Sequence, residues 1–92
     1  MRRELVSLSV AGEVITFKTG YLRPSEQDPS LFTIRLKGVG QSFSDLFALF
    51  GSPQHATIVT KDNETFHGYV RTIHLEDGAN GEAALEGLFT PR

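Results

Sequence analysis

The chain has 92 residues, of which 39% are hydrophobic and 22% are charged, and its formal net charge is -2 at pH 7. This length fits one domain over residues 1–92, and the composition is that of a folded globular protein. Cysteine is absent, which excludes disulfides, thiolate nucleophiles and cysteine-ligated zinc. Residues 1–61 carry seven bases and five acids, whereas residues 62–92 carry two bases and six acids. This polarity can orient a protein partner, but it is not the clustered basic surface that signals nucleic-acid binding.

The chain carries no apolar segment of membrane-spanning length. Its longest apolar stretch, Leu46 to Phe50, is much shorter than a bilayer crossing requires. Met1 to Arg3 has the basic start of a signal peptide, but the residues that follow alternate as in a strand and form no apolar core. We therefore expect no membrane association and a cytoplasmic or virion-associated protein.

The first elements form a predicted β-hairpin. Residues 5–10 alternate between apolar and polar, Ala11-Gly12 offers a tight turn, and residues 13–17 resume the alternation. Gly20 is expected to end the second arm. Residues 24–30 have the proline and polar content of an exposed loop.

A third strand and a helix follow the loop. Residues 31–37 alternate, with Phe32, Ile34 and Leu36 predicted to face inward. Residues 42–50 carry apolar side chains at helical spacing, and Gly51 and Pro53 stop the helix. An isolated helix of about two turns is unstable in water, so its phenylalanines should be buried.

The C-terminal half is predicted to be a second hairpin, residues 55–60 and 65–75, followed by a last strand over residues 82–90. A bulge near Arg71-Thr72 is expected, because the inward positions change from even to odd numbers there. The register that we predict for the hairpin pairs Thr60 with Phe66, Ile58 with Gly68, Ala56 with Val70, Val59 with His67, and His55 with Arg71.

These elements predict a mainly β (α+β) fold. It is a small antiparallel β-barrel or sheet of about six strands with one short amphipathic helix. No internal repeat or linker divides it.

No set of residues indicates catalysis, a metal site or a cofactor. Gly38 to Ser42 follows a strand and opens a helix as phosphate-binding loops do, but a flexible connection is the preferred interpretation. The three histidines are interpreted as surface residues, because the predicted register keeps His55 and His67 apart. Residues 76–82 gather oxygen ligands around two glycines, which is also the composition of a turn. We therefore expect a protein that is not an enzyme.

The outward positions of the predicted strands supply the candidate interaction surface. Tyr69 shares a face with His67 and Arg71, and this mixture of aromatic and cationic side chains is enriched in protein interfaces. The surface that we select for testing consists of Arg35, Lys37, His67, Tyr69 and Arg71.

Residues 58–70, IVTKDNETFHGYV, resemble the first motif of the Sm-like family of RNA-binding rings. In that family an acidic or amide residue stands in the turn and a glycine stands six positions later, which Asp62 and Gly68 match. Phe66 and Val70 occupy the apolar positions. The resemblance implies a barrel that binds RNA as a ring.

The order of elements is similar to that of small β-rich proteins of phage and prophage tail modules, which place a phenylalanine-rich helix before a hairpin with a Gly-Tyr pair. Here these are residues 42–50 and Gly68-Tyr69. The resemblance implies virion assembly. The function that we predict is a non-enzymatic module that binds a protein partner or itself, with an Sm-like RNA-binding ring as the alternative and a small ligand near Gly38 to Ser42 left open.

Overall fold

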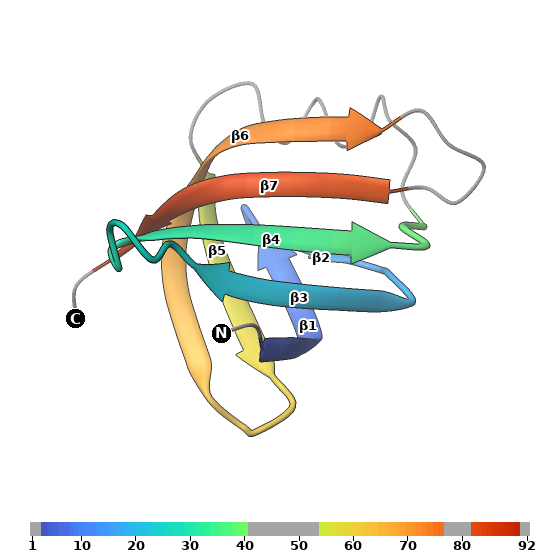
Figure 1. The fold of residues 1–92 in the computed structure, drawn as a ribbon. Coiled ribbons are helices and arrows are strands. Elements are labelled where there is room, and N and C mark those ends of the chain that lie inside the picture. The colour runs from blue at the N-terminus through green and yellow to red at the C-terminus, as the bar shows by residue number, and fades with distance from the viewer. Residues whose placement is uncertain (1–2, 41–53, 77–81, 91–92) are drawn as a thin grey trace.

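The computed structural model describes residues 3–40, 54–76 and 82–90, which form seven strands (Figure 1). The predicted helix over residues 42–50 lies outside the described residues, as does most of the turn predicted within residues 76–82. Within the described part, no helix has the length and hydrophobicity that a bilayer crossing needs. The strands are β1 (Arg3–Val10), β2 (Glu13–Ile15), β3 (Thr19–Pro24), β4 (Leu31–Lys37), β5 (Gln54–Thr60), β6 (Thr65–Glu76) and β7 (Glu82–Phe89).

Six of these strands close into an antiparallel barrel. Their order is β1-β3-β4-β7-β6-β5, and β5 returns to pair with β1. β2 lies outside this ring and pairs with the end of β1. In Figure 1, β3, β4 and β7 form the front wall, while β1, β2 and β5 lie behind. The prediction of a small antiparallel β-barrel is confirmed, and closure pairs each strand of the ring on both sides.

The first hairpin forms as predicted. Ala11 and Gly12 both have positive φ, 53° and 80°, which is the conformation of the two-residue turn that matches the twist of paired strands. Leu8 pairs with Ile15 and Val10 with Glu13 across it.

The prediction that Gly20 ends a strand is wrong, because Gly20 lies inside β3. This glycine is buried, and a Cβ placed on it would lie 2.8 Å from the side chain of Leu36 and 3.1 Å from that of Phe17. The residue is therefore required by a close approach inside the barrel and not by a turn.

The hairpin of β5 and β6 has a register two residues away from the predicted one. The Asn63 N–H donates to the Thr60 carbonyl and the Thr60 N–H donates to the Glu64 carbonyl, both at 3.0 Å, and Asn63 has φ 64°. The turn is thus a three-residue loop ending in a left-handed residue. The same side chains still face outward, but their neighbours change. The pairs are Ile58 with Phe66, Thr57 with His67, Ala56 with Gly68, and His55 with Tyr69.

The predicted bulge in β6 is confirmed. The register between β6 and β7 shifts between Val70 and Thr72, so Arg71 has no direct partner across the ladder. The bend lets β6 pair first with β5 and then continue along β7, as Figure 1 shows.

The core fills the barrel with inward side chains from every strand of the ring. The predicted inward positions of β4 are confirmed, since Phe32, Ile34 and Leu36 are buried. Phe32 packs against Phe89 with ring centroids 4.7 Å apart. The buried apolar residues are Leu5, Leu8, Val10, Ile15, Leu22, Phe32, Ile34, Leu36, Ala56, Ile58, Val70, Ala83 and Leu85.

Candidate binding surfaces

The five residues selected from the sequence all face outward, but they do not form one patch. Arg35 and Lys37 lie on β4, whereas the other three lie on β6, and β7 separates these strands. All five are exposed. They therefore belong to two walls of the barrel, which differ in the charge of their outward side chains. The β6 members are His67, Tyr69 and Arg71.

On the β5 and β6 wall, three rings form a contiguous cluster. The imidazoles of His55 and His67 stack with centroids 5.5 Å apart and an interplanar angle of 24°. The ring of Tyr69 meets His55 edge-on at 5.7 Å. The predicted register paired His55 with Arg71 and so kept it apart from His67, and His55 was not among the residues selected from the sequence. The three-residue turn corrects that placement.

This cluster belongs to a wider surface without formal charge, which we call the uncharged face. Strand pairing aligns Val14, Ser9, Thr57 and His67 in one row across β2, β1, β5 and β6. Val14 is 61% exposed and Tyr69 is 46% exposed. Protein interfaces are depleted in charge at their centres and enriched in aromatic residues. The uncharged face consists of Ser7, Ser9, Val14, His55, Thr57, Val59, Thr65, His67 and Tyr69.

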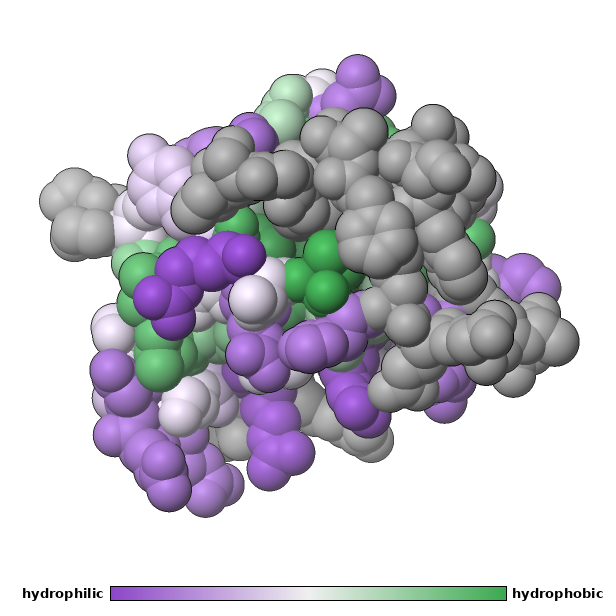
Figure 2. All heavy atoms as spheres, turned by 90° about the horizontal axis from the view of Figure 1, so that it is seen from above, coloured by the Kyte–Doolittle hydropathy of each residue, from purple (hydrophilic) through white to green (hydrophobic). Residues whose placement is uncertain are grey.

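The opposite wall carries charges of both signs, and we call it the charged face. Tyr21 pairs with Arg35 across β3 and β4, and these two residues line a depression of about 460 Å³ with Arg23 and Thr33. Lys37 Nζ lies 4.0 Å from a carboxylate oxygen of Glu82 on β7. Figure 2 shows hydrophilic side chains spread over one view of the molecule, with apolar side chains exposed between them. The charged face consists of Tyr21, Arg23, Thr33, Arg35, Lys37, Glu82 and Glu86.

Arg71 lies beside the border between the two faces. It lines a shallow depression of about 210 Å³ together with Leu31 and Thr33 of β4 and Glu86 of β7. The bulge in β6 places it there, between the pair of Val70 with Gly87 and the pair of Thr72 with Glu86.

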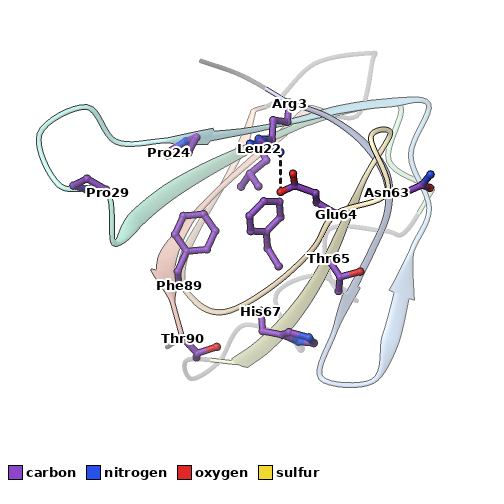
Figure 3. A pocket seen from close by; sticks show the side chains of 11 residues that line it. Arg3, Leu22, Pro24, Pro29, Asn63, Glu64, Thr65, His67, Phe89 and Thr90 are labelled. Atoms are coloured by element: carbon purple, nitrogen blue, oxygen red, sulfur yellow. Dashed lines mark ion pairs between the residues drawn. The ribbon is translucent and has the colours of Figure 1, made fainter. Parts of the chain in front are cut away.

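A larger cleft of about 790 Å³ opens at one end of the barrel (Figure 3). Its apolar walls come from Leu22 and Pro24 of β3, Pro29 of the following loop, and two phenylalanines, Phe66 and Phe89. The two phenylalanine rings lie 5.7 Å apart and continue into the core through Phe32. The cleft also reaches Thr65 and His67, so it adjoins the uncharged face.

An ion-pair network holds one rim of this cleft. Arg3 Nη1 lies 2.9 Å from Asp62 Oδ2 and 3.0 Å from Glu64 Oε2, and its guanidinium stands 5.4 Å above the centroid of Phe66. The Thr60 hydroxyl donates to Asp62, and with the charge of Arg3 this lowers the pKa of the Asp62 carboxyl. On the neighbouring strand pair, the carboxylate of Glu4 raises the pKa of Lys61. The network fixes the turn of β5 and β6 against β1.

Sequence reasoning missed the cleft and its rim. Arg3 and Asp62 are 59 positions apart, so only the pairing of β1 with β5 brings them together. A sequence signal for the uncharged face did exist, since the alternating outward positions 55, 57, 59, 65, 67 and 69 contain no Lys, Arg, Asp or Glu.

Among the described residues, no group of three or more His, Cys, Asp or Glu side chains is placed to hold a metal ion. Comparison of the chain with protein families, with curated proteins and with solved structures finds no match. The proposals below therefore rest on the residues and their geometry.

Proposed function

We propose that this protein is a non-enzymatic assembly module that binds protein through the uncharged face, and that its first partner is a second copy of itself. The observation that carries the proposal is the absence of formal charge at nine neighbouring outward positions, while the opposite wall is rich in charge. Two identical faces brought together place like groups near one another, so a charged face repels its copy and an uncharged face does not.

The exposed apolar side chains of this face supply the driving force. Val6, Val14 and Tyr69 are the large hydrophobic residues exposed in the described part of the chain, at 58%, 61% and 46%. Val14 and Tyr69 lie on the uncharged face, and Val6 lies beside it in the bulge of β1. Burying aromatic and aliphatic side chains stabilises interfaces most. The similarity of layout to small phage and prophage tail proteins agrees with this proposal, and virion assembly is the role that it implies.

The experiment measures the mass of the protein in solution across a range of concentrations, for the wild type and two matched variants. Val14→Glu places a carboxylate on the uncharged face, and Thr19→Glu places the same group at an exposed position of β3. We expect the wild type to associate with increasing concentration. Val14→Glu should weaken this association at least about tenfold, because an unpaired charge would be buried, whereas Thr19→Glu should not.

A wild type that stays monomeric at every concentration contradicts self-association, and equal loss in both variants contradicts the choice of face. Circular dichroism and thermal unfolding check that both variants remain folded.

A second candidate function is the binding of single-stranded RNA, as the resemblance to Sm-like proteins implies. The observation that favours it is the depression on the charged face, where Tyr21 stands between Arg23 and Arg35. An aromatic ring beside guanidinium groups suits stacked bases and phosphates. Retention on oligo-uridine that weakens with salt and is lost in Arg35→Ala would support this function. Retention unchanged in that variant would contradict it.

A further inference from the structure

The stacked imidazoles of His55 and His67 are the strongest chemical feature of the uncharged face. They lie diagonally on neighbouring strands, two residues apart along the ladder, because His55 pairs with Tyr69 and His67 pairs with Thr57. Their ring centroids are 5.5 Å apart. Both side chains are exposed, so both rings are open to ions in solution.

Imidazole nitrogen is a good ligand for Zn²⁺, Ni²⁺ and Cu²⁺. Metal–nitrogen distances of about 2.0 to 2.1 Å require the two ligating nitrogens to approach to about 3 Å. Each ring carries a nitrogen at its edge, and rotation of two exposed side chains can bring those edges together from a centroid separation of 5.5 Å without moving either strand. A rigid sheet therefore presents the pair at a spacing that one ion can bridge.

We propose that His55 and His67 together form a two-imidazole site for a divalent transition metal ion. No third histidine, cysteine or carboxylate joins them among the described residues. Water fills the remaining coordination positions, which open outward from the sheet. The inference does not depend on self-association, because both imidazoles belong to one chain.

The third histidine of the chain provides the matched control. His74 is also exposed on β6, but it lies beyond the bulge and pairs with Ala84 of β7. Its replacement removes one imidazole from the surface and leaves the pair intact.

The test is isothermal titration of the untagged protein with NiCl₂ and ZnCl₂, for the wild type and for His55→Ala, His67→Ala and His74→Ala. We expect the wild type and His74→Ala to bind with the same affinity. His55→Ala and His67→Ala should both lose binding to the same low level, because one imidazole cannot chelate.

Two results would overturn the site. One is binding that survives in either of the two variants of the pair. The other is an equal loss of binding in all three single variants, which would indicate independent weak contacts with separate imidazoles. All three substituted positions are exposed, and thermal unfolding of each variant verifies the fold.

Discussion

Truncation of Phe32 to alanine tests whether the barrel core is packed as described. Phe32 is 2% exposed, and its ring fills the space beside two glycines, Gly87 of the adjacent strand β7 and Gly68 of β6. A Cβ on either glycine would lie 2.7 or 2.8 Å from that ring, which shows how closely it packs. Removing a buried phenylalanine ring costs about 3 to 5 kcal/mol. A chain of 92 residues has a total stability of roughly 5 to 14 kcal/mol, so the loss is a large part of it.

Thermal and urea unfolding measure this loss. For a domain of this size we expect the midpoint to fall by roughly 12 to 40 °C, with an unchanged urea dependence if the barrel still forms. Tyr69→Ala is the control, because Tyr69 is 46% exposed. This substitution should lower the free energy of unfolding by less than about 0.5 kcal/mol. A cost below about 1 kcal/mol for Phe32→Ala would refute the packing. A cost for Tyr69→Ala as large as that for Phe32→Ala would show that β6 has its faces reversed.

Two further predictions concern a buried glycine and the decrease of the free energy of unfolding at acid pH. Gly87→Ala should lower the free energy of unfolding by more than about 2 kcal/mol, because the new Cβ would lie 2.1 Å from the Tyr69 carbonyl oxygen. A Cβ at Gly12 meets no atom within 4 Å, so Gly12→Ala should cost about 1 kcal/mol for its positive φ alone. Chemical unfolding separates these outcomes, and equal costs would count against the close approach. The pKa of Asp62 is lowered in the folded state by the Thr60 hydroxyl and by Arg3, so its contribution to stability is present above the unfolded value and is lost as pH falls through the folded one. Between about pH 6 and pH 2, the free energy of unfolding should therefore fall less steeply with decreasing pH in Asp62→Asn than in the wild type. An identical pH dependence in both proteins would contradict the role of this carboxylate.

The alternation of apolar residues predicted most of the strands. The clearest case is β4, where Phe32, Ile34 and Leu36 lie inward as the period of two requires. The bulge in β6 was also predictable, because the inward phase changes within a single segment. Both predictions depend only on residues that are close in sequence.

The errors arose where distant residues or turn geometry decide the outcome. A glycine is typical of a strand end, but Gly20 lies within β3, where the side chain of Leu36 on another strand leaves no room for a Cβ. The register of β5 and β6 depended on the left-handed conformation of Asn63, which an asparagine adopts readily but does not require. That error of two residues preserved the outward face and hid the neighbouring histidines.

The candidate surfaces were partly predictable for the same reason. His67 and Tyr69 were placed together correctly, because they share one strand. Val14 and Ser9 lie on the same face as these two residues because β1 pairs with β5, and the two strands are about 50 positions apart in the sequence. Arg35 and Lys37 were grouped with them because the sequence shows that all are outward, but not that β7 lies between.

The most direct test of the assembly role is a dilution series of ¹H–¹⁵N correlation spectra, which locates the contact surface residue by residue. The proposal predicts that amide signals of Val14, Thr57 and His67 shift with concentration, while those of Arg35 and Lys37 on the charged face stay fixed. Shifts confined to the charged face, or spectra that do not change across the series, would contradict self-association through the uncharged face.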